Sequence, residues 1–220
     1  IGDPEMHAHL LQFDSVHGRW HAHFSTEENS ITIDGIQIPV TKESNLQDLP
    51  LDGVDVLIDC TGAFKTELKL SPYFLGGVKK VVVSAPVEDG ATANIVYGVN
   101  ENTYDSDTHQ IITAASCTTN SLAPVVKVLM EGIGIKHGAF TTIHNVTNTQ
   151  TIVDRPSRDL RRARSALNNL IPTSTGSANA IMLIYPKLKG KLNGHAVRVP
   201  VLNASITDCV FEMVRETTVS

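Results

Sequence analysis

The chain has 220 residues, of which 41% are hydrophobic and 19% charged, and its formal net charge at pH 7 is −5. This balance predicts a globular protein and excludes a disordered tail, and it does not favour a nucleic-acid partner. No apolar run is long enough for a membrane span, and three cysteines, Cys60, Cys117 and Cys209, give no disulfide framework. A soluble protein of the reducing cytoplasm, with no membrane partner, is therefore expected.

The first part of the chain predicts a helix, a meander and then buried parallel strands. Residues 4–13 read as a short helix, and residues 20–40 alternate and turn like an antiparallel meander with a hairpin at Asp34-Gly35. Short apolar runs bounded by turn residues follow, which is typical of strands inside a doubly wound α/β sheet. The predicted strands cover residues 54–60, 81–85, 95–98 and 111–114, with a crossover helix over 68–75.

From Cys117 onward the pattern changes to a helix followed by longer alternating strands. The strands are predicted at residues 139–145, 195–199 and 204–214, and a second helix at 177–185. This pattern indicates an α+β domain with an antiparallel or mixed sheet. We therefore predict two domains, residues 1–116 and residues 117–220.

Cys117 lies at the turn between a predicted strand and a predicted helix. Backbone N–H groups and the helix dipole stabilise a thiolate at such a place, and a thiolate can attack a carbonyl. A lone cysteine is also often a buried small hydrophobic residue, and this alternative stays open on position alone. Ser116 and Thr118 add hydroxyls that suit an anion, and His144, near the end of a strand, is a candidate general base and acid.

Four motifs then occur in one order along the chain. They are SCTTN from residue 116, HNVTNTQ from 144, VDRPSRDLRRAR from 153 and IPTSTGSA from 171. Together they resemble the phosphorylating glyceraldehyde-3-phosphate dehydrogenases. The resemblance, which covers essentially the whole chain, implies an incomplete doubly wound Rossmann-type NAD-binding domain followed by an α+β catalytic domain. Because the first strand and the glycine-rich turn of that family do not precede Ile1, the chain reads as an internal fragment truncated at both ends, expected to be inactive and poorly stable alone.

The resemblance also implies a reaction and a set of site residues. Cys117 would attack the aldehyde of glyceraldehyde 3-phosphate, His144 would take the hydroxyl proton, NAD would accept hydride, and inorganic phosphate would cleave the resulting thioester. The substrate phosphate would be held by Thr147, Thr149 and Arg198. The attacking phosphate would be held by Ser116, Thr118, Arg162, Thr175 and Gly176. The cofactor would be held by Thr61, Gly62, Phe64 and Ser84, and the full protein would be a homo-oligomer, most simply a tetramer.

Several alternatives remain at this stage. Without the resemblance, Thr175 reads as a helix cap, and Arg162 and Arg198 as surface salt-bridge partners. The spelling HNVTNTQ is similar to a subgroup from bacterial arsenic-resistance clusters, in which arsenate replaces phosphate. Erythrose-4-phosphate dehydrogenase, a non-catalytic binding module and a cysteine hydrolase are the other functions considered. The residues present do not decide between NAD and NADP, and no metal site is predicted.

Overall fold

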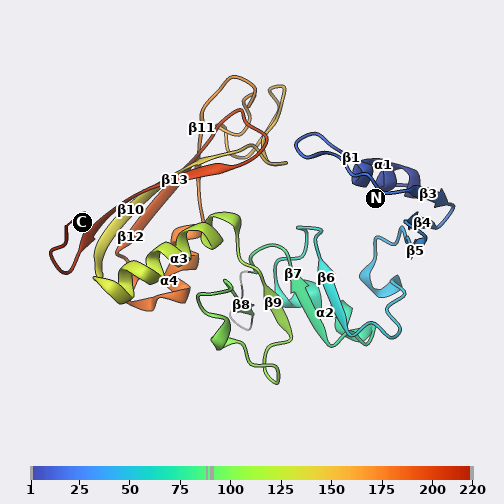
Figure 1. The fold of residues 1–220 in the computed structure, drawn as a ribbon, viewed down its shortest axis with the longest axis horizontal. Helices are drawn as coiled ribbons and strands as arrows, with labels where there is room; N and C mark the ends of the chain where they lie inside the picture. The colour runs from blue at the N-terminus through green and yellow to red at the C-terminus, as the bar shows by residue number, and fades with distance from the viewer. Residues whose placement is uncertain (1, 88, 90–91, 219–220) are drawn as a thin grey trace. The chain divides into compact units, whose positions relative to one another are not determined.

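The computed structural model describes residues 2–87, 89 and 92–218 (Figure 1). The outer limits of the two predicted domains, residues 1 and 220, lie outside the described residues. By its internal contacts the chain divides into two compact units, Ile1–Asp55 with Ser71–Lys79, and Val56–Leu70 with Lys80–Ser220. The domain boundary predicted between residues 116 and 117 is a different division and stays a prediction.

The first unit contains the predicted helix and the predicted meander. Helix α1 spans Pro4–Gln12 with proline in its first turn, and β1 (Phe13–Asp14) pairs with β2 (Gly18–Arg19) in a hairpin the sequence did not predict. The meander consists of β3 (Phe24–Glu27), β4 (Ser30–Ile33) and β5 (Ile36–Pro39), all antiparallel. Asp34 and Gly35 both have positive φ, 47° and 83°, as a tight hairpin turn requires. A short 3₁₀ turn, η1, follows at Leu46–Asp48.

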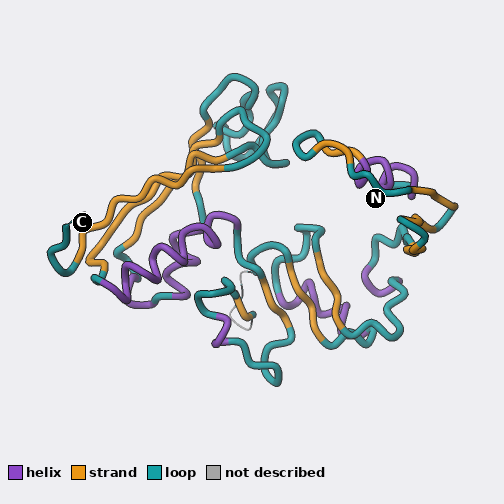
Figure 2. The backbone as a smooth tube through the Cα atoms, in the orientation of Figure 1, coloured by secondary structure: helices purple, strands orange, loops and turns teal. Residues whose placement is uncertain are grey.

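The second unit begins with the predicted parallel sheet, whose strands are drawn in orange in Figure 2. Its strand order is β6-β7-β9-β8, from β6 (Val56–Asp59), β7 (Lys80–Val83), β9 (Ile111–Thr113) and β8 (Ala93–Asn94), and every pair is parallel. Helix α2 (Glu67–Leu75) connects β6 to β7 along the chain, as predicted. Buried valines at Val81 and Val83 explain the apolar run that indicated this strand.

The strand predicted at residues 95–98 is wrong. β8 ends at Asn94, and the chain then turns, because Asn100 accepts a hydrogen bond from the Val96 N–H through Oδ1 and donates its own N–H to the Val96 carbonyl. Gly98 has a φ of 82° in this turn. The apolar signal came from Val96, which is 1% exposed and belongs to the hydrophobic core without being part of a strand. A 3₁₀ turn, η2 (Glu101–Thr103), follows.

The predicted mixed sheet also belongs to the second unit. Its order is β11-β12-β10-β13, from β11 (Ile171–Ser174), β12 (Leu192–Arg198), β10 (Ile135–His144) and β13 (Ser205–Met213). β10 and β12 are parallel, whereas the two outer pairs are antiparallel. Helices α3 (Cys117–Gly132) and α4 (Ser177–Ile184) pack together and, with the 3₁₀ turn η3 (Pro186–Leu188), contribute to one core with this sheet. The fully buried members of that core include Leu122, Val126, Ile181 and Leu188.

Helix lengths also bear on the membrane question. Across the part of the chain that the structure describes, no helix combines the length and the apolar composition that a membrane span requires.

Candidate active site

Cys117 is the first residue of α3, as the sequence predicted. Strand β9 ends at Thr113, and only three residues separate it from the helix. Ser116 is the N-cap, and its Oγ accepts a hydrogen bond from the Thr119 N–H at 3.2 Å. The first N–H groups of a helix have no partner within the helix and carry the positive end of its dipole. The exposed Cys117 thiol therefore stands where a negative sulfur, or an anion beside it, is stabilised.

The turn before Cys117 is held in an uncommon conformation. Ala115 has a φ of 55°, in the left-handed region that residues other than glycine rarely adopt. Its N–H donates to Thr113 Oγ1 at 2.9 Å, and Asn120 Nδ2 donates to the carbonyls of Ala114 and Ser116 at 2.7 and 2.9 Å. These bonds fix the turn and so fix the position of Cys117. No positioning role was predicted for Thr113 or Asn120, although both lie within a few residues of the thiol.

His144 is the last residue of β10 and faces Cys117. Its side chain is almost completely buried, at 5% exposure, and its Nε2 lies 3.4 Å from the Cys117 Sγ. On the other side of the ring, Nδ1 lies 2.8 Å from the Asn145 carbonyl oxygen and 2.8 Å from Arg198 Nη1. Because β10 and β12 are parallel, with His144 opposite Arg198, the two side chains reach the same sheet end.

The contact with Arg198 selects one arrangement of protons on the ring. A guanidinium can only donate, so its 2.8 Å contact with Nδ1 is a hydrogen bond only when Nδ1 is unprotonated. The same Nη1 also donates to the Asn145 carbonyl at 3.0 Å, which satisfies that oxygen. The neutral ring then carries its hydrogen on Nε2, directed at the sulfur. If the hydrogen moves to Nδ1, the Asn145 carbonyl accepts it, so both tautomers have a partner.

Burial and charge favour the neutral imidazole. The pKa of His144 lies below its usual value, first because burial disfavours the charged ring and also because of the positive charge on Arg198, while the hydrogen bond to the Asn145 carbonyl opposes the shift. The pKa of Arg198 is also lowered, first by burial and then by the positive charge of Arg162, and the neighbouring Cys117 opposes this. Two guanidiniums thus influence each other close to the thiol, which is an arrangement that an anion would stabilise.

A cavity of about 710 Å³ opens at the thiol. Of the residues predicted for catalysis and phosphate binding, the lining includes Ser116, Cys117, Thr118, His144, Thr175, Gly176 and Arg198. Thr175 is not the cap of α4, because the N-cap is Gly176, although Thr175 Oγ1 accepts the Ser177 N–H at 3.2 Å at the start of this helix. Residues that the sequence did not single out, Lys65, Asn94 and Asn179, line the cavity as well.

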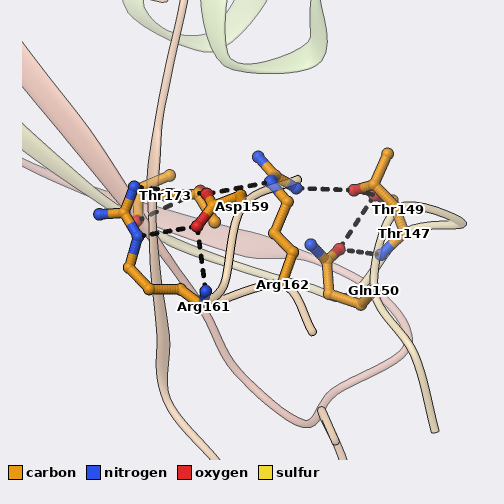
Figure 3. A network of polar contacts seen from close by, with 8 residues as sticks. Thr147, Thr149, Gln150, Asp159, Arg161, Arg162 and Thr173 are labelled. Carbon is orange, nitrogen blue, oxygen red and sulfur yellow. Dashed lines mark hydrogen bonds and ion pairs between the residues drawn. The ribbon is translucent and has the colours of Figure 1, made fainter. Parts of the chain in front are cut away.

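The other phosphate residues form a polar network of their own (Figure 3). Thr147 Oγ1 and Thr149 Oγ1 are 3.0 Å apart, and Arg162 Nη1 donates to Thr149 Oγ1 at 2.8 Å. Arg162 Nε also lies 3.7 Å from the Asp159 carboxylate. The sequence prediction gave Thr149 and Arg162 to two different phosphates, whereas the structure joins their side chains directly. None of these residues lines the large cavity, although the charge of Arg162 acts on Arg198.

The residues predicted to hold the cofactor stand at the carboxyl ends of β6 and β7. Asp59 Oδ1 accepts hydrogen bonds from the N–H and the hydroxyl of Thr61, at 2.8 and 2.7 Å, and Gly62 has a φ of 66° in the turn that follows. The Ser84 N–H donates to the Asp59 carbonyl at 2.9 Å, which ties the two strand ends together. Phe64 follows the same turn and is half-buried. Carboxyl ends of parallel strands are where doubly wound sheets bind ligands.

Comparison with known proteins places these features in one family. The family model "Glyceraldehyde 3-phosphate dehydrogenase, C-terminal domain" matches residues 116–220, and "Glyceraldehyde 3-phosphate dehydrogenase, NAD binding domain" matches residues 1–67. A relative named glyceraldehyde-3-phosphate dehydrogenase 3, from Nostoc sp., is 59% identical over 96% of this chain. Glyceraldehyde-3-phosphate dehydrogenase 1 of Bacillus cereus is 49% identical over 100% of the chain, and glyceraldehyde-3-phosphate dehydrogenase of Streptomyces coelicolor is 49% identical over 99%. The chain belongs to the glyceraldehyde-3-phosphate dehydrogenase family.

The chain covers only part of the length of each of these relatives. The chain spans 63% of the Nostoc protein, 66% of the Bacillus cereus protein and 65% of the Streptomyces coelicolor protein. The family resemblance predicted from the motifs is therefore confirmed, while the arsenic-resistance subgroup and the roles of individual residues stay predictions. Two residues missed by the sequence reasoning, Asn145 and Gln150, contact His144 and Thr147. Both lie inside HNVTNTQ, in which roles were predicted only for the histidine and the threonines.

Proposed function

We propose that the protein is an NAD-dependent phosphorylating aldehyde dehydrogenase that converts glyceraldehyde 3-phosphate into an acyl phosphate. The observation that carries this proposal is the contact between Cys117 Sγ and His144 Nε2 at 3.4 Å, at a helix N-terminus and inside a cavity. Covalent catalysis requires a nucleophile in contact with a base, and a further group that orients the base. Here the Asn145 carbonyl and Arg198 orient His144 through Nδ1. Two nearby guanidiniums add the positive charge that phosphorylated reactants need.

In the proposed reaction, the Cys117 thiolate attacks the aldehyde carbon and forms a thiohemiacetal. The developing oxyanion lies near the N–H groups at the start of α3 and near Nε2 of His144. His144 then takes the hydroxyl proton on Nε2, which requires the ring hydrogen to be on Nδ1, where the Asn145 carbonyl accepts it. Oxidation leaves a thioester on Cys117, and inorganic phosphate attacks it to release the acyl phosphate and regenerate the thiolate.

NAD is the proposed cofactor, and it would accept the hydride released during oxidation. The residues present fit such a ligand: Thr61 and Gly62 form a tight turn braced by Asp59, and Ser84 is tied to the same carboxyl end of the sheet. The family model for the NAD binding domain, which matches residues 1–67, also supports this assignment. We assign cofactor binding to residues 1–116 and catalysis to residues 117–220.

Two anion sites are proposed around the thiol. Thr147, Thr149 and Arg198 would hold the phosphate of the substrate, and Arg162 would stand between the two sites because it binds Thr149 and influences Arg198. The second site, for inorganic phosphate, would consist of Ser116, Thr118, Arg162, Thr175 and Gly176. Four of these five line the cavity together with Cys117.

Assembly and location are proposed on more general grounds. One face of β13 exposes Ile206 and Val210, at 68% and 70%, and Ile143 of β10 lies beside Ile206 in the sheet. Apolar side chains exposed along one sheet face favour association, so we propose a homo-oligomer, most simply a tetramer. Free cysteines within the described residues are compatible with a cytoplasmic protein.

The test is NADH formation, followed by absorbance, with the protein expressed from its whole gene, glyceraldehyde 3-phosphate, and either phosphate or arsenate. The wild type should form NADH, and Cys117→Ser should abolish it while leaving folding unchanged. If a folded wild type binds NAD but oxidises only erythrose 4-phosphate, the proposed substrate is wrong. Release of free acid from an acyl thioester without any nicotinamide would replace the proposal with a cysteine hydrolase.

A further inference from the structure

Gln150 has a side chain that the proposed reaction does not use. The residue is 8% exposed, and its Oε1 accepts two hydrogen bonds from Thr147, one from the N–H at 2.9 Å and one from the hydroxyl at 3.1 Å. The backbone N–H can only donate, so it fixes which end of the amide faces Thr147. The other end, Nε2, is buried and has no hydrogen-bond partner among the residues that the structure describes.

The two bonds to Oε1 set the direction of a chain of hydroxyl groups. The single hydroxyl hydrogen of Thr147 is donated to Gln150, so Thr147 Oγ1 can only accept from Thr149. Thr149 in turn accepts from Arg162 Nη1. Arg162 therefore donates to Thr149, Thr149 to Thr147, and Thr147 to Gln150; the residues can be followed in Figure 3. For Thr147 to donate to an anion, its hydroxyl hydrogen has to leave Gln150 Oε1, whereas Thr149 has only to release Thr147 Oγ1.

Two donors, one on Gln150 and one on Arg198, are unused among the described residues. Gln150 Nε2 and Arg198 Nε are both buried without a partner within the described part of the chain. A buried N–H group without an acceptor is destabilising, and an oxygen-rich ligand removes this cost by accepting from it. Arg162 and Arg198 add positive charge, and the Asp159 carboxylate, 3.7 Å from Arg162 Nε, balances only part of it. The region is therefore richer in donors and positive charge than in acceptors.

We propose that Gln150 is a positioning residue for the substrate phosphate, because its buried amide fixes Thr147 and sets the direction of the Thr147–Thr149–Arg162 hydrogen bonds. This inference rests on the proposed function, since it gives a substrate-phosphate role to Thr147 and Thr149. When the phosphate binds, the Thr147 hydroxyl hydrogen passes from Oε1 to a phosphate oxygen. Oε1 keeps the backbone N–H of Thr147, so no buried acceptor is left without a partner.

A purely structural role is the competing explanation, and Gln150→Glu separates the two. Glutamate has the same shape and can accept both hydrogen bonds from Thr147, so a loop-fixing role would be preserved. It also places a negative charge behind the two threonines, which opposes a phosphate bound there. Gln150→Met is the uncharged second variant, which removes the acceptor altogether. Gln110→Glu is the matched control, because Gln110 is exposed, its backbone carbonyl accepts from the Val81 N–H, and its side chain makes no hydrogen bond to the residues that the structure describes.

The first measurement is calorimetric binding of glycerol 3-phosphate, with glycerol as the blank, to the protein expressed from its whole gene. We expect Gln150→Glu to raise the Kd about tenfold, which is about 1.4 kcal/mol, and Gln150→Met to raise it at least threefold. Gln110→Glu should leave it unchanged. A Kd within twofold of the wild type in both Gln150 variants would overturn the proposal, as would an equal rise in the Gln110 control. Because binding is measured without turnover, this result stands even if the proposed reaction fails.

Steady-state kinetics supply the second readout. With glyceraldehyde 3-phosphate, Gln150→Glu should raise KM about tenfold and leave kcat within twofold. With unphosphorylated glyceraldehyde, kcat/KM should stay within twofold of the wild type. Equal losses with both aldehydes would show a general structural defect and refute the positioning role. A wild type that oxidises neither aldehyde would refute the proposed function alone.

Discussion

Replacing Arg198 with methionine should move the hydrogen of the His144 ring from Nε2 to Nδ1. In the structure Arg198 Nη1 donates both to Nδ1 and to the Asn145 carbonyl, so the ring hydrogen faces the Cys117 sulfur. Without the guanidinium, the Asn145 carbonyl, 2.8 Å from Nδ1, is the remaining partner and is an acceptor. The ring therefore places its hydrogen on Nδ1, and Nε2 stops donating to the sulfur. One lowering influence on the pKa of His144 is removed at the same time.

The size of the effect follows from the bond that is lost. A hydrogen bond to a charged group contributes about 1.5–3 kcal/mol, so the thiolate loses a factor of about 12 to 150 in its equilibrium with the thiol. A less stabilised thiolate is also more nucleophilic, with a Brønsted coefficient of about 0.4–0.5. This gain offsets about half of the loss on a logarithmic scale, so the alkylation rate falls by about the square root of that factor. The alkylation rate of Cys117 should thus fall about 4- to 12-fold. Loss of the positive charge of Arg198 acts in the same direction.

Two assays test this reasoning at about pH 8, where a histidine of ordinary pKa near 6.5 is neutral. Iodoacetamide labelling gives the rate at Cys117, and nitrogen chemical shifts of ¹⁵N-labelled histidine report which ring nitrogen carries the hydrogen. Arg162→Met is the control, since it removes a neighbouring positive charge without removing the bond to His144. The reasoning fails if Arg198→Met leaves the His144 nitrogen shifts unchanged, or if the control slows labelling equally.

Three further outcomes are expected. Gly194→Ala should destabilise the fold by about 1–3 kcal/mol in urea unfolding, because an added Cβ would lie 2.3 Å from the Phe140 ring; an unchanged midpoint would contradict this packing. Ser116→Ala should cost about 1 kcal/mol, because it removes the acceptor of the Thr119 N–H, and thermal unfolding of the variant beside Ser121→Ala measures it. Because burial lowers the pKa of His144, the folded protein binds protons less readily than the unfolded chain; stability from the neutral ring is complete above about pH 6.5 and declines below it. His144→Asn should flatten that decline when urea midpoints are compared across pH.

Local signals in the sequence were sufficient for most of the elements. The start of α3 at Cys117, the Asp34-Gly35 hairpin and the strands β6 and β7 each follow from residues within a few positions of one another. The burial predicted for β6 is wrong, because Val56 and Ile58 are 54% and 68% exposed. The strand predicted at residues 95–98 failed for a tertiary reason: Val96 is apolar because it joins a core, while Asn100 turns the chain. β11 was missed because its four residues, with Pro172 among them, show no clear strand pattern, and pairing with β12 determines it.

The residues of the site could be predicted from the sequence, but the contacts between their side chains could not. His144 and Arg198 were both candidates, yet their contact depends on a parallel register between strands that are far apart in sequence. The same holds for Thr149 and Arg162, which the motifs assigned to separate phosphates and the structure joins at 2.8 Å. Partners such as the Asn145 carbonyl leave no signal of their own, because any residue type supplies a carbonyl.

The electrostatic state of the thiol is therefore a property of strand pairing as much as of the helix that carries it. Cys117 lies at the N-terminus of α3, but His144 is on β10 and Arg198 on β12. Arg198 determines which nitrogen of the His144 ring carries the hydrogen. A one-residue slip between β10 and β12 would turn Arg198 to the other face of the sheet and leave Nδ1 with the Asn145 carbonyl as its partner. Gly194, opposite Phe140 in the same ladder, helps prevent such a slip, since its missing side chain leaves room for the ring at that single register. A packing residue four positions from Arg198 thus constrains the tautomer of His144, and Gly194→Ala should slow Cys117 labelling as well as lower stability.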